Sequence, residues 1–150
     1  MRRASWIAVL LAGLSWAAPV PFAAAGETIG IVRNSTGKAS ITRDSQAFPA
    51  PAGTKLFAGD TLSTGPDGSM GAILRDNSTI SLGPSSTLVI GDFLFAPAEG
   101  KLRLLVRISR GTMSYLSGLI GKFAPESARF ETPVASIGIR GTRFAVKVDE

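Results

Sequence analysis

The side chains that most often carry out catalysis are missing from this 150-residue chain, which contains neither histidine nor cysteine. Ser-His-Asp and Cys-His nucleophilic sites are therefore excluded, as are zinc or copper sites built on imidazole or thiolate ligands. Ser117 and Lys122 could form a Ser–Lys pair, but serine followed by lysine is common and this spacing matches no specific motif. The inventory predicts a protein that is not an enzyme and has no cofactor and no metal site.

The aspartates are the remaining candidates, since paired carboxylates can hydrolyse glycosidic bonds. Asp60, Asp67, Asp76 and Asp92 mostly lie beside glycine, proline or asparagine, where aspartate commonly stabilises turns. The Asp67-Gly68 pair lacks the acidic ladder of a calcium loop. No glycine-rich phosphate-binding motif opens a helix. We therefore interpret these carboxylates as turn residues.

One arginine is distinguished by its setting near the end of the chain. Arg140 lies in a glycine turn with Gly141 and Thr142. A guanidinium fixed in this way can bind a carboxylate or phosphate of a partner. The alternative is structural: Arg140 pairs with Glu131 or Asp149 inside the domain, and the Thr142 hydroxyl bridges the turn. Both roles stay open, and these three residues are the candidate interaction or structural-turn site.

Residues 1–25 have the order of a secretory signal peptide. Arg2 and Arg3 precede an apolar stretch, Trp6–Trp16, and Ala23–Ala25 supplies small residues before Gly26. A retained anchor is the alternative, because the apolar span is nearly long enough to cross a bilayer, but the prolines that follow the stretch favour cleavage. A cysteine-free exported chain suits a Gram-negative periplasm. We expect one periplasmic domain over residues 26–150, with no stable membrane anchor after cleavage.

The basic character of the chain is only weak evidence for a nucleic-acid partner. Two of its 16 Lys and Arg residues lie in the leader, so the remaining 14 against 11 acids give a net charge of +3. Nucleic-acid binders gather such charges on one face or stripe, whereas these are scattered along the sequence. We expect no nucleic-acid partner, and at most a weak attraction to anionic lipids or acidic proteins.

Turn residues recur every eight to twelve positions and separate short stretches with β-type alternation. The clearest stretch is Lys101–Ser109, after which Gly111 is expected to turn the chain into the next strand. The two glycines in residues 118–123 predict a loop with at most one helical turn. The final strand is expected to point Phe144 and Val146 toward the core. The pattern predicts a single all-β domain.

A short internal sequence repeat, which we call the internal echo, is informative about the architecture. Residues 62–70 resemble residues 80–88 at an offset of 18, each copy reading as strand, Gly-Pro turn and strand. Such repetition suggests stacked, similar coils, as in a β-solenoid or roll. A pair of hairpins in a β-sandwich is the alternative. Between the copies, Asp76-Asn77 predicts a tight hairpin turn, because asparagine tolerates a positive φ.

An ordered set of short motifs gives the chain a family resemblance. The set consists of Gly59-Asp60-x-Leu62-x-Thr64-Gly65, Asp67-Gly68-Ser69, Leu74-x-Asp76-x-Ser78-x-Ile80-x-Leu82, Thr132-Pro133-Val134 and Ile139-Arg140-Gly141-Thr142-x-Phe144. It resembles the FecR domain family over nearly the whole mature chain, from about residue 29 to residue 148. The closing motif is the most specific part.

The resemblance implies an all-β, solenoid-like or roll-like extracytoplasmic domain. In full-length regulators of this family the domain senses a loaded outer-membrane transporter and controls a cytoplasmic sigma factor. We expect no anti-sigma segment and no module after Glu150 here, so that activity does not carry over. The sequence therefore predicts a stand-alone, non-catalytic interaction or signalling module whose partner is an envelope protein, such as an outer-membrane transporter or inner-membrane sensor. The alternative is a module that binds a small ligand, a cell-wall glycan or a peptide.

Overall fold

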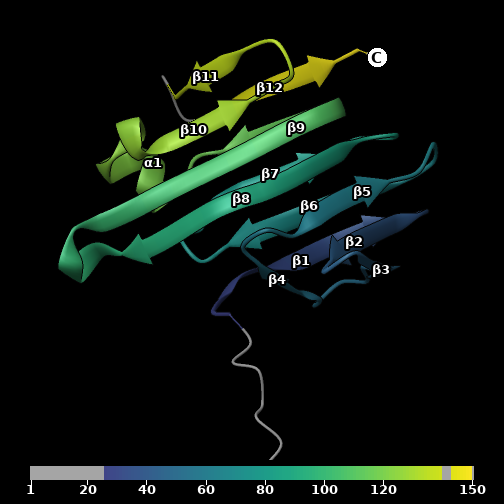
Figure 1. Ribbon diagram of the computed structural model, residues 1–150, viewed down its shortest axis with the longest axis horizontal. Coiled ribbons are helices and arrows are strands. Elements are labelled where there is room, and N and C mark those ends of the chain that lie inside the picture. Colours follow the sequence, from purple (N-terminus) through teal and green to yellow (C-terminus); the bar gives the residue numbers. More distant parts are fainter. Residues whose placement is uncertain (1–25, 140–142, 150) are drawn as a thin grey trace, which may run out of the picture.

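The computed structural model describes residues 26–139 and 143–149, and this part of the chain is all-β with one short α-helix (Figure 1). The elements are β1 (Thr28–Thr36), β2 (Ala39–Arg43), β3 (Gln46–Pro49), β4 (Lys55–Phe57), β5 (Thr61–Thr64), β6 (Ser69–Leu74), β7 (Thr79–Leu82), β8 (Thr87–Ala96), η1 (Pro97–Glu99), β9 (Lys101–Leu116), α1 (Leu119–Phe123), η2 (Pro125–Ser127), β10 (Ala128–Glu131), β11 (Ser136–Gly138) and β12 (Arg143–Val148). The predicted all-β class is confirmed.

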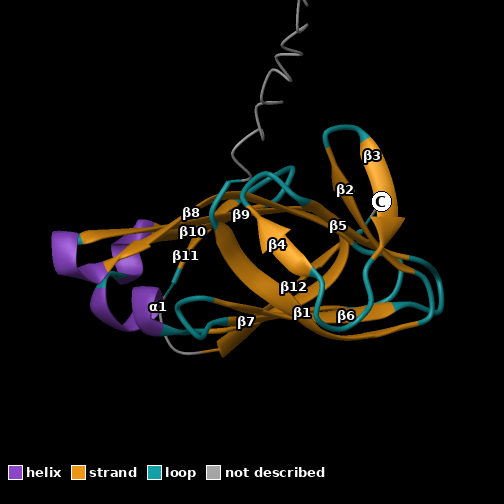
Figure 2. Ribbon diagram, turned by 90° about the horizontal axis from the view of Figure 1, so that it is seen from below, coloured by secondary structure: helices purple, strands orange, loops and turns teal. Residues whose placement is uncertain are grey.

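The strands form one strongly curled sheet, antiparallel except for one pair, and this half-barrel has two halves that face each other (Figure 2). One half has the order β3-β2-β5-β8-β9 and the other β9-β7-β6-β1-β4. Strand β9 belongs to both, because residues 101–110 pair with β8 and residues 113–116 pair with β7. Strand β12 pairs with β9 in the second half, and β10 pairs in parallel with β9 in the first.

The internal echo corresponds to two bends of one long antiparallel hairpin. In the first copy β5 leads through Gly65-Pro66 into β6, and in the second β7 leads through Gly83-Pro84 into β8. Each copy therefore crosses from one half of the sheet to the other. β5 pairs with β8, and β6 pairs with β7, both antiparallel. The repeated sequence therefore corresponds to two similar bends in a curled sheet. In the predicted β-solenoid, by contrast, the repeated coils would stack in parallel.

The bends are hydrogen-bonded to one another in a row that we call the corner seam, formed by Lys38, Thr64-Gly65, Ser85-Ser86 and Thr112. The Gly65 amide donates to the Lys38 carbonyl and the Ser85 amide donates to the Gly65 carbonyl, each at 2.9 Å. The Thr64 hydroxyl donates to the Gly83 carbonyl at 2.6 Å and accepts from the Ser86 amide at 3.0 Å. These bonds satisfy backbone groups at bends where the regular ladder is interrupted.

The hydrophobic core lies between the two halves of the sheet. In β5, β7 and β9 alternate side chains are buried, as the period of a half-buried strand requires. Residues from both halves of the sheet contribute to the core. Its completely buried members include Val32, Ile41, Leu88, Val106 and Met113. Because both halves contribute, separating them would expose the inward face of each.

Of three local predictions made for turns, two are confirmed and one is wrong. Asn77 has a φ of 66° in the predicted hairpin turn, and residues 119–123 form the single helical turn allowed for that loop. The sequence predicts that Gly111 turns the chain into a new strand, and this is wrong. Gly111 lies within β9 and bends it, and this strand runs for 16 residues. Its φ of 88° and its position against Ser86 in the seam explain why the chain bends there without breaking. Within the described residues no helix has the length and apolar character needed to span a membrane.

Replacing Gly111 by alanine tests the corner seam. A Cβ at this position would lie 2.5 Å from the Ser86 Cα, so the substitution adds a steric overlap to the cost of a positive φ. We expect Gly111→Ala to lower the free energy of unfolding by about 3 kcal/mol. The matched control is Gly100→Ala, which has a φ of 67° but nothing within 4 Å, and should cost about 1 kcal/mol. Equal losses in urea denaturation would show that the seam is not tightly packed.

Candidate functional site

Strand β12 is the outermost strand at one edge of the curled sheet (Figure 1). Its six residues pair with β9, from Arg143 opposite Leu116 to Val148 opposite Gly111. Among the described residues no strand pairs with its other side. The backbone groups on that side are therefore able to accept an additional strand.

A groove of about 460 Å³ runs beside β12. It is lined on one side by Ile137 and Ile139, which lie in and directly after β11, and on the other by Phe144 and Val146 of β12. All four side chains lie in or against the hydrophobic core. The open edge of the sheet is thus accompanied by a strip of apolar surface.

An aromatic cluster fixes the position of β12. The Phe144 ring lies 5.5 Å from the ring of Tyr115 in β9 and 4.8 Å from that of Phe130 in β10, measured between centroids. The Tyr115 and Phe130 rings are 4.6 Å apart. The first and third of these contacts are tilted and the second is edge-on, and aromatic contacts of this kind add to the free energy of area burial. The edge is therefore held by both halves of the sheet.

Among the described residues, Tyr115 carries the one titratable group with a large pKa shift. Its side chain is buried, and its hydroxyl makes no hydrogen bond within the described part of the chain. Burial, followed by the negative charge of nearby Asp76, raises the pKa of Tyr115 to about 12. The phenol stays neutral at physiological pH, so we assign it a packing role.

The sequence-predicted residues Arg140, Gly141 and Thr142 lie outside the described residues. Their flanks are described: Ile139 is buried and Arg143 is exposed. The two acids proposed as internal partners of Arg140 each have another cation. The Arg107 Nε donates to Glu131 at 2.8 Å, and the Lys147 Nζ lies 3.5 Å from the carboxylate of Asp149.

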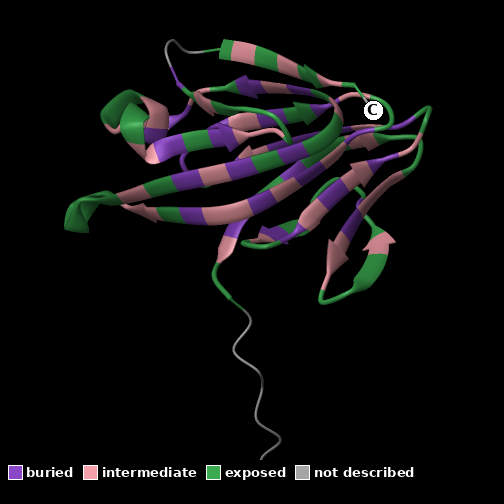
Figure 3. Cartoon of the chain, turned by 45° about the horizontal axis from the view of Figure 1, so that its top comes forward, coloured by how far each residue is buried: buried purple, intermediate pink, exposed green. Residues whose placement is uncertain are grey.

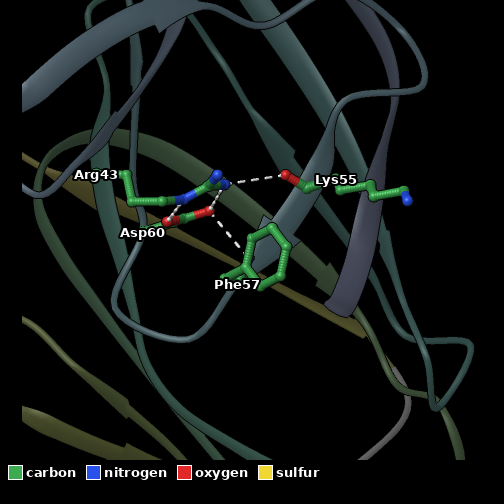
Figure 4. Close-up of polar contacts among 4 residues, drawn as sticks. All are labelled: Arg43, Lys55, Phe57 and Asp60. Atoms are coloured by element: carbon green, nitrogen blue, oxygen red, sulfur yellow. Dashed lines mark hydrogen bonds and ion pairs between the residues drawn. The ribbon is translucent and has the colours of Figure 1, made fainter. Parts of the chain in front are cut away.

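Asp60, Asp67 and Asp76 lie in or directly after turns, as expected, and Asp60 also makes a long-range ion pair. The prediction is wrong for Asp92, which lies within β8 and accepts a hydrogen bond from Arg103 at 3.0 Å. Asp76 is buried and accepts hydrogen bonds from the Ser78 amide and, in α1, from the Ile120 amide. Asp60 is also buried, and it accepts from the Phe57 amide at 2.9 Å and from two nitrogens of Arg43, at 2.8 and 2.7 Å (Figure 4). Sequence reasoning missed this pair, because 17 residues separate its members.

The Arg43 guanidinium is held in a fixed orientation. It donates to the Lys55 carbonyl at 3.1 Å, and it lies over the rings of Phe57 and Phe48, 4.4 and 5.2 Å from their centroids. Such bidentate, stacked arginines are rigid. The arrangement ties the β4–β5 turn to β2.

A second hollow, of about 540 Å³, lies beside Arg43. Aromatic side chains line it, namely Phe57, Phe93 and Phe95, and two ion pairs stand near them: Arg43 with Asp60, and Arg75 with Glu27. Phe93 is buried and Phe95 is half-buried, and both also face this cleft. The cleft combines an apolar lining with charges of both signs.

The β12 groove is lined by apolar side chains and glycine, whereas the cleft beside Arg43 also contains Glu27 and Asp44. Within the described residues no three acidic, histidine or cysteine side chains gather closely enough to hold a metal ion. The Ser117 hydroxyl donates to the neighbouring Gly118 carbonyl at 3.3 Å. The β12 edge combines backbone hydrogen-bonding groups that have no partner strand among the described residues with an apolar groove, features that could receive an extended peptide.

Comparison with known families adds one finding. Residues 60–150 match the family model described as FecR protein. The matched region begins at Asp60 and contains the internal echo, the glycine turn and β12, whereas the resemblance read from the sequence began earlier, near residue 29. No curated protein and no solved structure matches the chain at a significant level.

The raised pKa of Tyr115 predicts a loss of stability in alkali. An unfolded tyrosine titrates near pH 10, so the contribution of the neutral buried phenol is complete below pH 10 and is lost as the pH rises toward 12. We expect the free energy of unfolding to fall by about 2 kcal/mol over that interval, beyond any fall measured for Tyr115→Phe. Tyr115 is the only tyrosine of the chain, so tyrosinate absorbance reports it directly. Titration near pH 10 in the folded protein would contradict the assignment.

Proposed function

The chain belongs to the FecR protein family, and on that premise we propose that it is a signalling accessory module that acts by binding another protein. The family is a non-catalytic one. The observation that carries the proposal is the β12 edge, where a strand that is paired on one side only among the described residues lies beside an apolar groove. We propose that an extended segment of the partner pairs with β12 and buries its apolar side chains in the groove.

The opposite edges of the sheet support this choice of surface. Strand β3 contains Pro49, which has no amide proton to donate, and strand β4 is only three residues long. Proline and short length are common ways of protecting an edge from pairing. β12 has six residues and no proline. It is therefore better suited than β3 or β4 to receive a strand.

We propose that the module works in the periplasm and that its partner is an envelope protein, such as an outer-membrane transporter or an inner-membrane sensor. The proposal rests on the leader sequence of residues 1–25 and on the family. We do not extend it to anti-sigma activity, since a likeness of fold does not carry a function. Arg140, Gly141 and Thr142 immediately precede β12 in the sequence.

Export can be tested on the full chain expressed in a Gram-negative host. The alanines before Gly26 predict cleavage after Ala25. We therefore expect a periplasmic protein whose mass is that of residues 26–150. The measurement is intact mass spectrometry of the periplasmic and membrane fractions. Recovery of the uncleaved chain in the membrane fraction would support a retained anchor instead.

A second candidate function is the binding of a small ligand or a cell-wall peptide. The specific observation in its favour is the cleft lined by Phe57, Phe93 and Phe95 beside the Arg43 guanidinium. An apolar pocket with a few fixed polar groups is the usual form of a ligand site. We rank it second because each arginine at the cleft is already paired with a carboxylate.

One experiment discriminates between the two surfaces. A photo-crosslinking amino acid is introduced in cells at Ala145, which is exposed on β12, and separately at Leu94, which is exposed beside the cleft. We expect Ala145 to capture one envelope protein through an extended segment, identified by mass spectrometry. A synthetic copy of that segment should then slow hydrogen exchange of the β12 amides in the purified protein.

The control position is Ala98 in η1, which is exposed at the far end of the β8–β9 hairpin. The same adducts at Ala98 and Ala145 would show non-specific capture and contradict the edge proposal. Adducts at Leu94 alone, with exchange slowed around Phe57 and Phe93, would favour the cleft. An interaction that leaves the β12 amides unprotected would also count against strand pairing.

A further inference from the structure

The two faces of β12 differ in chemistry. Phe144, Val146 and Val148 are half-buried and pack against the core, whereas Arg143 and Lys147 are exposed, with Ala145 between them. The stripes of exposure along this strand are visible at the top of Figure 3. Directly opposite residues of paired strands point to the same face. Any strand added to β12 must therefore present one set of side chains to the groove and the other set to Arg143 and Lys147.

We propose that the strand received by β12 alternates apolar residues with aspartate or glutamate. This inference rests on the proposed function and adds the chemistry of the partner. Its apolar side chains would enter the groove between Ile137 and Val146. Its carboxylates would lie opposite or diagonal to Arg143 and Lys147, where opposite charges stabilise a cross-strand pair and like charges destabilise it.

The two cations are able to meet such a partner. The ion pair between Lys147 and Asp149 has a separation of 3.5 Å, and both side chains are about three-quarters exposed or more. Exposed pairs of this kind contribute little free energy. Exchange of Asp149 for an incoming carboxylate therefore costs little. The cations also discourage strands that carry basic residues, which is a common way of protecting an edge.

A second copy of the chain fits this edge less well. With matching faces, antiparallel pairing centred on Ala145 places Arg143 opposite Lys147 of the second copy. The register centred on Val146 places Arg143 opposite Asp149 of the second copy, but it sets the two Lys147 side chains diagonally to each other. A separate strand with acids at both positions pairs with both cations. Charge complementarity thus favours an acidic partner over self-association.

The test uses two soluble nine-residue peptides, one alternating valine with glutamate and the other valine with lysine. Binding to the purified protein is measured by fluorescence anisotropy at low salt, and its location by hydrogen exchange. We expect the glutamate peptide to bind about tenfold more tightly than the lysine peptide, to protect the β12 amides, and to lose this advantage at high salt because exposed charges are screened.

The variant that tests the charges is Arg143→Glu combined with Lys147→Glu, and it should reverse the preference of the protein for the two peptides. The matched control is Arg33→Glu combined with Lys55→Glu, which makes the same change in net charge at exposed positions of β1 and β4. This control should keep the preference for the glutamate peptide. A preference that follows net charge in both variants would overturn the inference.

The remaining outcomes separate this inference from the proposed function. Equal protection of β12 by both peptides would overturn the acidic partner and leave strand pairing intact. Failure of both peptides to protect β12 would overturn the strand-pairing mode itself. A dimer in size-exclusion chromatography that Val146→Lys abolishes would assign the edge to a second copy of the chain and likewise overturn the acidic partner.

Discussion

The structure depends on the hydrogen bonds at the bends of its long strands. A strand that turns from one half of the sheet into the other cannot keep its regular ladder, and each bend leaves backbone groups that need partners. The hydroxyls of Thr64 and Ser86 supply several of them: Thr64 bonds to the Gly83 carbonyl and the Ser86 amide, and Ser86 accepts from the Thr112 amide. Both side chains are buried, where an unsatisfied polar group would be costly. The row of bends is what makes a sheet curl around a core.

A curled sheet that does not close into a barrel has edge strands. The difference between its protected edges and its open edge connects the fold to the proposed function. At one end β3 and β4 are protected by proline and by short length. At the other end the aromatic cluster of Tyr115, Phe130 and Phe144 fills the core and stabilises β12, while the outer side of β12 has no partner among the described residues. A rigid edge is a better template for an incoming strand than a mobile one, because less conformational entropy is lost on binding.

Much of the local structure could be predicted because it depends on neighbouring residues. The alternation in residues 101–109 predicts a strand whose inward side contains Leu104, Val106 and Ile108, and these are buried. The asparagine of the Asp76-Asn77 turn has the expected positive φ. The ordered motifs led to the FecR family, and the family match confirms that resemblance over residues 60–150. The candidate site was anticipated only in part. Ile137 gives no distinctive signal in the sequence, and Arg140 to Thr142, which were singled out from the sequence, lie outside the described part.

By itself the sequence determined the all-β class, the family and the lack of histidine and cysteine chemistry, since composition, period and motif order are properties of the chain alone. Only the tertiary structure decided what the internal echo means. Two segments 18 residues apart could stack in parallel or fold back on each other, and the pairing of β5 with β8 and β6 with β7 requires the second arrangement. It also decided that Asp60 binds Arg43 and that β12 lies at an edge beside an apolar groove. These contacts join residues distant in sequence, and their formation depends on packing that no local pattern specifies.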